Sequence, residues 1–411
     1  MTTSAQHKSQ LSLLQSVLQE QDIEVSAILQ VLQNFQVAIP SWALGAGGTR
    51  FGRFSIGGEP TNLEQKIEDI ALVNKLTRCA DSVSLHIPWD IPTDPVAIRQ
   101  YAHEKGVSFD SVNSNTFQDY GQTHSYKFGS LGHIKAEVRQ QAIEHNQQVI
   151  DIGESLGAKV LTVWLADGSS FPGQHNLSGA LADTQKSLQA IYSHMPADWR
   201  LLIEYKPFEP NFYSMVIPDW GTSLMLANAC GERAFTLVDL GHHLPNTNIE
   251  QIVATLSWQK RLGGFHFNDS KFADDDLSVG SVKPYQLFLI FNELVGEISA
   301  GGERISWMID ASHNLKDPLE DLMQSLENIQ IALAKALLID QAKLGAAQQE
   351  NDVTLCQEIL RNAYETDVRP LVSEARIRAG GVLNPIDSYR QNRIREKLVE
   401  KRGRDSSATG L

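Results

Sequence analysis

Short apolar runs recur along the chain, and segments with helical periodicity separate them. The runs are nearly continuous in apolar residues instead of alternating apolar with polar, which is typical of parallel strands buried on both faces of a sheet. Eight such runs occur, at residues 37–44, 82–89, 108–114, 160–166, 200–205, 235–240, 262–268 and 305–310. We therefore predict eight parallel strands that alternate with helices.

The segments between these runs carry apolar residues at the spacing of an amphipathic helix. In residues 133–156 the apolar face ends at Leu156, and Gly157 marks the end of the helix. Asp317, placed directly before Pro318, predicts the start of a further helix after the last run. The other expected helices are residues 8–33, 64–78, 95–105, 177–194, 220–229, 249–258 and 285–297.

Strands and helices that alternate in this way indicate a (β/α)8 TIM barrel, an α/β fold of about 250 residues. A doubly wound open sheet is the alternative, but no GxGxxG motif follows the first expected strand. We expect residues 1–343 to form the catalytic barrel domain with its N-terminal helix. Residues 344–402 are expected to add a C-terminal helical arm that packs on a neighbouring subunit, and residues 403–411 to be disordered.

Composition restricts the possible partners. The chain has 411 residues, of which 42% are hydrophobic and 20% charged, so it can bury a large core. Its formal net charge of -14 gives no electrostatic support for nucleic acid, which requires clustered lysine and arginine. The three cysteines lack CxxC spacing, and we expect them to be reduced. Because no signal-like start and no apolar run of about 20 residues occurs, we expect a cytoplasmic protein without a membrane partner.

Polar and aromatic side chains gather where the expected strands end. Active sites of this type of barrel lie at the carboxyl ends of the strands. A buried polar group costs free energy unless it is paired or bound to a ligand. So many polar residues at the ends of apolar strands are therefore poorly explained as solvent-exposed positions. The residues are His86, Trp89, Asn113, Trp164, Asp167, Glu204, Lys206, Asp239, His242, His266, Asp269 and Asp310.

Two spacings, one within this set and one just after His266, carry chemical information. Glu204 and Lys206 lie two residues apart on an expected strand and therefore face the same side. The pair could be a structural salt bridge, or a metal-binding carboxylate beside a lysine that polarises a substrate oxygen. Asp274 and Asp276 form a D-x-D pattern that could be a solvated acidic turn. The two histidines of the same stretch favour a metal site instead.

The carboxylates and imidazoles form two expected metal centres. Oxygen-rich ligands with one imidazole in each set, and no thiolate, favour Mn²⁺, Co²⁺ or Mg²⁺ over structural zinc. Two adjacent ions can hold neighbouring substrate oxygens and stabilise charge that moves between adjacent carbons. The first centre would comprise Glu204, Asp239, His266 and Asp310, and the second His242, Asp274 and Asp276, with Asp239 bridging the two.

Aromatic residues at the same strand ends suggest a sugar subsite. Trp89 and Trp164 could present flat faces to the apolar side of a sugar ring. His86 lies three residues before Trp89. It is either a core histidine whose hydrogen bonds are made within the protein, or a residue that contacts the substrate. We also expect Glu204 and His242 to contact the substrate in addition to the metal ions.

Several long motifs together resemble the L-rhamnose isomerases of the broad-specificity bacterial type, which belong to the xylose-isomerase-like barrel superfamily. The resemblance runs from about residue 10 to about residue 400 and includes the C-terminal helices. The motifs are SLHIPWD, NSNTF, SYKFGSL, LTVWLADGS, VDLGHHLPNTN, GGFHFNDSK followed by ADDD, and MIDASHN.

This resemblance implies a homotetrameric aldose–ketose isomerase with two divalent ions, most commonly Mn²⁺, that converts L-rhamnose to L-rhamnulose. It assigns the same residues to the two metal centres as above. It implies catalytic roles for four residues, namely His86 near the ring oxygen, Lys206 near the reacting carbons, and Asp310 with Ser312 in proton exchange. It also implies that Phe51 reaches the substrate site of a neighbouring subunit.

Three other functions are compatible with parts of the pattern. A single-metal ketose 3-epimerase on the same barrel needs two carboxylates at C3 but has no use for His242 and the D-x-D pattern. A metal-dependent phosphodiesterase or endonuclease would favour a basic groove, which the charge of -14 opposes. A non-catalytic sugar-binding protein would not require two complete sets of metal ligands.

Overall fold

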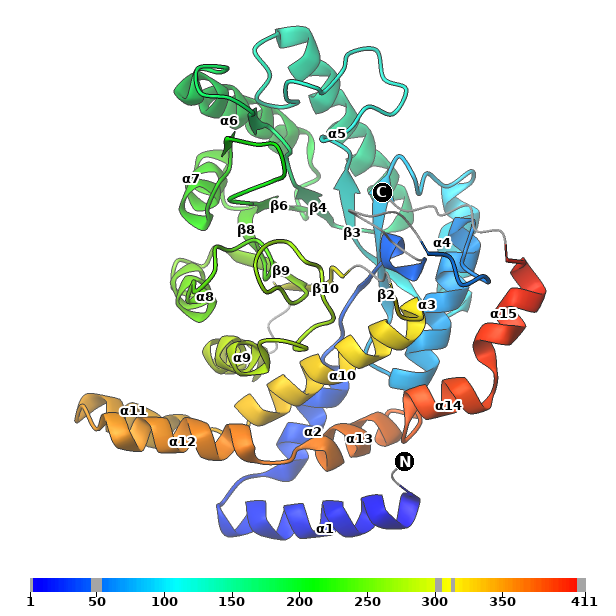
Figure 1. Ribbon diagram of the computed structural model, residues 1–411, viewed down its shortest axis with the longest axis vertical. Coiled ribbons are helices and arrows are strands. Elements are labelled where there is room, and N and C mark those ends of the chain that lie inside the picture. Colours follow the sequence, from blue (N-terminus) through cyan, green and yellow to red (C-terminus); the bar gives the residue numbers. More distant parts are fainter. Residues whose placement is uncertain (1–2, 46–53, 300–304, 312–314, 405–411) are drawn as a thin grey trace.

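The computed structural model describes residues 3–45, 54–299, 305–311 and 315–404. A central sheet is surrounded by helices, and the C-terminal helices run along one side of the molecule to its right-hand edge (Figure 1). The N-terminal helix lies below them, at the bottom of the view. Among the described residues, no helix combines the length and the apolar character that crossing a membrane requires.

Eight parallel strands form the central sheet in the order in which they occur along the chain. A parallel bridge between Ala38 and Met308 joins its two edges, and the amide of Ala38 donates to the carbonyl of Trp307 at 2.7 Å. The predicted TIM barrel is therefore confirmed. The strands are β1 (Ile39–Pro40), β2 (Ser82–Ile87), β3 (Ser108–Ser114), β4 (Val160–Val163), β6 (Arg200–Glu204), β8 (Ala234–Asp239), β9 (Leu262–Phe267) and β10 (Ser306–Ile309).

In the described part of the chain, eight helices cover the outside of the barrel, each with an apolar face toward the strands. Five of their N-termini are capped by short polar side chains, as when Asn62 accepts a hydrogen bond from the amide of Gln65. The predicted cap at Asp317 is confirmed, because its carboxylate accepts from the amide of Leu319. The helices are α3 (Leu63–Thr77), α4 (Pro95–Glu104), α5 (Ala136–Leu156), α6 (Leu177–His194), α7 (Trp220–Cys230), α8 (Ile249–Trp258), α9 (Pro284–Ser299) and α10 (Pro318–Ala336).

Two elements near the N-terminus differ from the sequence prediction. Residues 8–33 form two helices, α1 (Ser4–Glu20) and α2 (Val25–Asn34), and not one. Asp22 between them has φ +60, a left-handed conformation that ends a helix, and Glu24 caps the next helix through the amide of Ser26. The first predicted strand is also shorter, because it turns into a 3-10 helix, η1 (Ser41–Leu44), directly after Pro40, which has no amide proton for a strand ladder.

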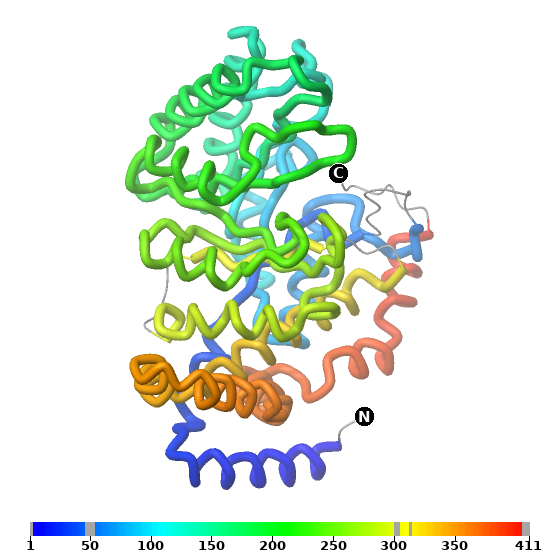
Figure 2. The backbone as a smooth tube through the Cα atoms, turned by 60° about the vertical axis from the view of Figure 1, so that its left-hand side comes forward, coloured from blue at the N-terminus to red at the C-terminus, as the bar shows by residue number. Residues whose placement is uncertain are grey.

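The predicted C-terminal helices are present, and the third of them ends at Arg378, just before Gly380 and Gly381. They pack along α2, α3 and α10 of the same chain (Figures 1 and 2). A small antiparallel sheet, β5 (Gly168–Ser169) with β7 (Ser214–Met215), lies apart from the barrel strands. The C-terminal helices are α11 (Gln341–Gln349), α12 (Val353–Glu365), α13 (Arg369–Arg378), α14 (Pro385–Gln391) and α15 (Ile394–Arg402).

Close packing inside the barrel generates a stability prediction at Gly263 in β9. A methyl group at this position would lie 2.4 Å from Leu202 Cδ2 and 2.4 Å from Phe235 Cβ. We expect Gly263→Ala to lower the free energy of unfolding by about 1–3 kcal/mol, because an overpacked core must shift its neighbours. In the control Gly345→Ala, on α11, an added methyl group has no heavy atom within 4 Å and should raise that free energy by up to about 1 kcal/mol. Urea denaturation measures both, and equal midpoints for Gly263→Ala and wild type would contradict the packing argument.

Candidate active site

Four side chains from neighbouring strands converge at the carboxyl end of the barrel. Glu204 ends β6, Asp239 ends β8, His266 lies in β9, and Asp310 directly follows β10. The Nδ1 atom of His266 lies 3.2 Å from Glu204 Oε1, 3.8 Å from Asp239 Oδ2 and 3.4 Å from Asp310 Oδ2. One potential ligand atom from each of the four residues lies within 4.8 Å of the others, so they could hold one metal ion.

A second group shares Asp239 with the first. The Nε2 atom of His242 lies 4.0 Å from Asp239 Oδ1 and 3.5 Å from Asp274 Oδ1. These three residues also have ligand atoms within 4.8 Å of one another. Asp276 has φ +48 and is hydrogen-bonded to Asp274, in the connection that follows β9. The structure thus brings together six of the seven residues that the sequence named for the two centres, and Asp276 contacts this cluster through Asp274.

Burial of so many charges shifts their proton affinities. Burial alone would raise the pKa of Glu204, but the nearby His266 and His242 outweigh it and hold that pKa well below its ordinary value. Burial would lower the pKa of His266, but Glu204 and the other carboxylates raise it to about 9. The pKa of Asp239 is raised to about 7, mainly by burial. Ion pairing with the imidazoles therefore compensates only part of the negative charge.

The carboxylates that remain crowded fit a divalent cation. Burial and the neighbouring carboxylates of Asp274 and Asp310 raise the pKa of Asp276 far above its ordinary value. The pKa of Asp310 is also raised by burial. A cation at this position would neutralise the crowded charges. Carboxylate oxygens with one imidazole in each group, and no thiolate among them, are the donors of a Mn²⁺, Co²⁺ or Mg²⁺ site.

Three groups that the sequence analysis did not single out orient these carboxylates. The side-chain amide of Asn268 donates to both oxygens of Asp239, at 3.0 and 3.1 Å. The backbone amide of Gly241 donates to Asp239 Oδ1 at 2.7 Å. The indole of Trp42 donates to Asp310 Oδ1 at 2.9 Å. Asn268 lies two residues after His266 and therefore faces the same side, a spacing that could have identified it. Trp42 had no such signal, because its partner is remote in the sequence.

Lys206 lies between two carboxylates and an aromatic ring. Its Nζ atom is 2.7 Å from Asp274 Oδ2, forms a second ion pair with Glu209, and lies 5.1 Å from the centre of the Trp164 ring. Burial would lower the pKa of Lys206, but Asp274 and Glu209 outweigh it and raise the pKa above its ordinary value. The side chain is therefore a buried, charged hydrogen-bond donor beside the second group. Glu209 was missed, because it lies in a connection that has no regular pattern.

Aromatic rings form a wall beside this cluster. The imidazole of His86 stacks on Trp89 with ring centres 4.8 Å apart and on Phe117 at 5.5 Å, and Trp42 approaches it edge-on at 5.5 Å. The ring of Phe117 lies 5.0 Å from that of Trp164. Burial lowers the pKa of His86 to about 3, so its imidazole is neutral. Its Nδ1 atom is buried and has no hydrogen-bond partner among the described residues.

A buried ion pair supports the backbone below this wall. Asp90 accepts hydrogen bonds from the amide of His86 at 2.8 Å, from Ser41 Oγ, and from Lys66 Nζ at 2.6 Å. The side chains of Lys66 and Asp90 are 3% and 1% exposed, so water competes little for this pair. The network ties the end of β2 to α3 and to η1.

Other predicted residues lie outside this geometry or play no direct part in it. Phe51 and Ser312 lie outside the described residues. Asp269 accepts hydrogen bonds from backbone amides of the following connection. Asp167 accepts from Ser130 and Gly132, so its carboxylate organises a loop.

Comparisons with known proteins agree with this fold. Residues 80–289 match a family model described as a xylose isomerase-like TIM barrel. A probable sugar isomerase of Mesorhizobium japonicum is 49% identical over 396 residues, which cover 96% of this chain and 92% of that protein. A probable sugar isomerase of Rhizobium meliloti is 48% identical, with 94% and 90% covered.

Solved structures of sugar epimerases share the fold. L-ribulose 3-epimerase superposes with a TM-score of 0.53 at 12% identity, over 78% of this chain and 98% of that one. D-psicose 3-epimerase from Clostridium cellulolyticum H10 gives 0.51 at 12% identity, over 74% and 99%. At this level of identity the likeness concerns the fold alone.

The ligand geometry predicts stabilisation by a divalent ion. Adding Mn²⁺ to chelator-treated protein should raise the free energy of unfolding by about 2.7 kcal/mol when the free ion is at about 100 times its Kd. Glu204→Gln should lose the share of this gain that the first ligand group provides, whereas Glu358→Gln, an exposed control on α12, should keep the whole gain. Thermal unfolding with and without Mn²⁺ measures the effect. A gain in Glu204→Gln as large as in wild type would contradict the assignment of Glu204.

Proposed function

The protein belongs to the xylose isomerase-like TIM barrel family, and from this premise we propose that it is an aldose–ketose isomerase that moves hydrogen between C1 and C2 of an opened sugar. Its barrel is of the sugar isomerase and epimerase type, and its curated relatives are named as probable sugar isomerases. Two features of the site, its ligand groups and its buried lysine, support isomerisation between C1 and C2 in particular.

The observation that carries the proposal is the pair of adjacent ligand groups that share Asp239. A reaction at C1 and C2 develops charge on two neighbouring oxygens, and two sites a few ångströms apart match that requirement. When bound, two divalent ions, Mn²⁺ in preference to Co²⁺ or Mg²⁺, would supply the positive charge that these oxygens need. We propose Glu204, Asp239, His266 and Asp310 for one ion and His242, Asp274 and Asp276 for the other.

The chain's own side chains supply the remaining functions. Lys206, charged and held beside Asp274, would donate a hydrogen bond to a substrate oxygen near C1 or C2. The neutral His86 would accept the proton of the anomeric O1 hydroxyl through its Nδ1 atom and return it to the ring oxygen as the sugar opens, so that one proton moves between the two oxygens and the imidazole is left unchanged. Asp310, together with Ser312, is proposed to move the proton between O2 and O1. The product differs from the substrate only in hydrogen positions, so no further reactant is required.

The aromatic wall would bind the sugar itself. Trp89 and Trp164 of this wall would pack against the apolar side of the sugar, while Glu204 and His242 would contact its hydroxyl groups as well as the metal ions. The motif resemblance favours L-rhamnose, converted to L-rhamnulose, with other aldoses as further substrates. A homotetramer in which Phe51 contacts a neighbouring site is part of the same proposal.

A ketose 3-epimerase is the second candidate, because solved epimerases share the fold. Such an enzyme inverts C3 and forms no aldose. The second ligand group, His242 with Asp274, is the observation that favours the isomerase, because a single-metal epimerase has no need of it. Product analysis distinguishes the two, since only the isomerase converts a ketose to a reducing aldose.

Lys206 provides the first functional test. Manganese-loaded protein should interconvert L-rhamnose and L-rhamnulose, and Lys206→Met should lower kcat/KM by about 100-fold, the usual loss on removal of one preorganised donor. Lys186→Met is the control, because its exposed side chain pairs only loosely with Asp183, at 3.7 Å. Steady-state assays by chromatography of both sugars give these values. A folded, metal-loaded wild type that leaves L-rhamnose and related aldoses unchanged would refute the isomerase proposal.

The second test separates the two metal centres. Asp274→Ala combined with Asp276→Ala should abolish turnover and reduce the metal content from about two ions per chain to about one, because the first group stays complete. Asp275→Asn is the control, since Asp275 lies between them and accepts only from the backbone amides of Lys271 and Phe272 among its described hydrogen bonds. Elemental analysis after dialysis measures the ions. Retention of both ions in the double variant is incompatible with the two-centre assignment.

A further inference from the structure

A buried hydrogen bond joins the connections that follow β6 and β8. The Tyr205 hydroxyl lies 2.6 Å from Nε2 of His243, and the two rings meet edge-on with centres 5.4 Å apart. Tyr205 is 2% exposed and His243 is 9% exposed, so water competes little for this bond. The Nδ1 atom of His243 lies 3.4 Å from the carbonyl oxygen of Leu240, which can only accept. The imidazole proton is therefore on Nδ1, and Nε2 accepts from the hydroxyl.

Both residues are next to ligand candidates in the sequence but face away from them. Glu204 and Lys206 reach the acidic cluster, so Tyr205 between them points to the opposite side of the chain. His242 also reaches the cluster, 3.5 Å from Asp274, whereas the imidazole of the next residue turns to Tyr205. The hydrogen bond therefore lies behind the site and outside both ligand groups.

The same two connections are also joined on the side of the site. The Nδ1 atom of His242 lies 3.2 Å from Glu204 Oε1. With two ions bound, these two side chains would turn to different ions and give up this contact, because they belong to different ligand groups. The strand ladder between β6 and β8 ends earlier, at Glu204 and Leu237. Among the described residues, the bond between Tyr205 and His243 is then the direct polar link that remains between the two connections.

We propose that Tyr205 and His243 are positioning residues that fix the spacing between the two ligand groups, and thereby the affinity of the second group for its ion. The inference rests on the proposed function, because it requires two bound ions. The first group takes its ligands from the ends of strands, which the sheet holds in place. The second group takes His242 and Asp274 from connections outside the strands, so it depends more on a link of this kind.

The test uses the full-length protein after chelator treatment. Tyr205→Phe removes the hydroxyl and keeps the ring, whereas His243→Gln keeps one acceptor and one donor on a more flexible side chain. Tyr389→Phe is the matched control, because Tyr389 on α14 is also 2% exposed and its hydroxyl also donates one hydrogen bond, to Asp317 at 2.9 Å. Calorimetry with Mn²⁺ gives the number of ions and their affinities. Amide hydrogen exchange is followed in residues 238–246 of the metal-free protein.

Of the two Mn²⁺ affinities, Tyr205→Phe should lower that of the second group about tenfold and that of the first by less than about threefold, the size of effect expected when one buried acceptor loses its donor. Residues 238–246 should exchange faster than in wild type, and His243→Gln should lose less affinity than Tyr205→Phe. Adding Tyr205→Phe to the variant with Asp274→Ala and Asp276→Ala should leave the affinity of the remaining ion within about threefold, because the first group holds that ion. Turnover of Tyr205→Phe should fall at limiting Mn²⁺ and return to within about threefold of wild type at saturating Mn²⁺.

Wild-type affinities for both ions in Tyr205→Phe would overturn the inference, as would wild-type exchange in residues 238–246. An equal loss of affinity in Tyr389→Phe, or a loss of turnover that saturating Mn²⁺ does not restore, would also overturn it, since either would indicate general loosening of the barrel. If Tyr205→Phe does not fold, His243→Gln is compared with wild type by the same measurements. A wild type that binds two ions but converts no aldose would refute the isomerase proposal and leave the positioning role intact.

Discussion

The arrangement of the candidate site depends on the position of one carboxylate, Asp239. Its oxygens accept three hydrogen bonds, from Asn268 and Gly241, and it lies between His266 on one side and His242 on the other. A buried carboxylate is costly unless it is paired, and here the pairing is divided between two imidazoles. This division is what allows one residue to belong to two ligand groups. Displacement of Asp239 would separate both groups at once.

Closure of the barrel makes this position possible. Glu204, Asp239, His266 and Asp310 come from four strands that are neighbours in the sheet, and the parallel register brings their ends to one level. The bridge between Ala38 and Met308 brings the first strand beside the last. It thereby places Trp42 within hydrogen-bonding distance of Asp310, although 268 residues separate them in the chain. The aromatic wall and the acidic cluster thus become parts of one site.

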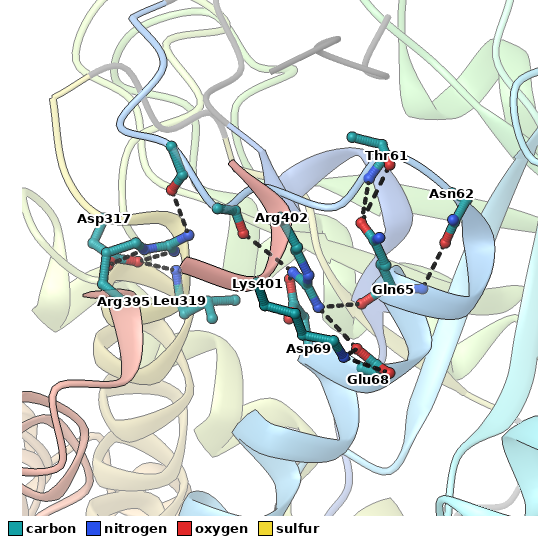
Figure 3. A network of polar contacts seen from close by, with 12 residues as sticks. Thr61, Asn62, Gln65, Glu68, Asp69, Asp317, Leu319, Arg395, Lys401 and Arg402 are labelled. Atoms are coloured by element: carbon teal, nitrogen blue, oxygen red, sulfur yellow. Dashed lines mark hydrogen bonds and ion pairs between the residues drawn. The ribbon is translucent and has the colours of Figure 1, made fainter. Parts of the chain in front are cut away.

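The helices around the barrel have unequal roles. Those that cover strands contribute apolar burial, which has no direction and tolerates variation. The C-terminal helix α15 packs Ile394 and Leu398 against the core and also donates charged hydrogen bonds of defined geometry to Asp69, Asp317 and the carbonyl of Gly58 (Figure 3). Directional contacts of this kind specify position more than they add stability. A segment that sequence analysis regards as an accessory arm is therefore connected, within its own chain, to the mouth of the barrel.

The sequence alone determined the barrel and the candidates for metal binding, because both leave local signals. Strands buried on both faces are nearly continuous in apolar residues, so Glu204, Asp239 and His266 stand out within them. The split of residues 8–33 into two helices was not visible, because a single left-handed residue, Asp22, decides it. The spacing of Asn268 from His266 could have identified it, but only the tertiary structure revealed the roles of Glu209 and Trp42. Each acts through a partner from another element, and periodicity carries no information about which distant residues will meet.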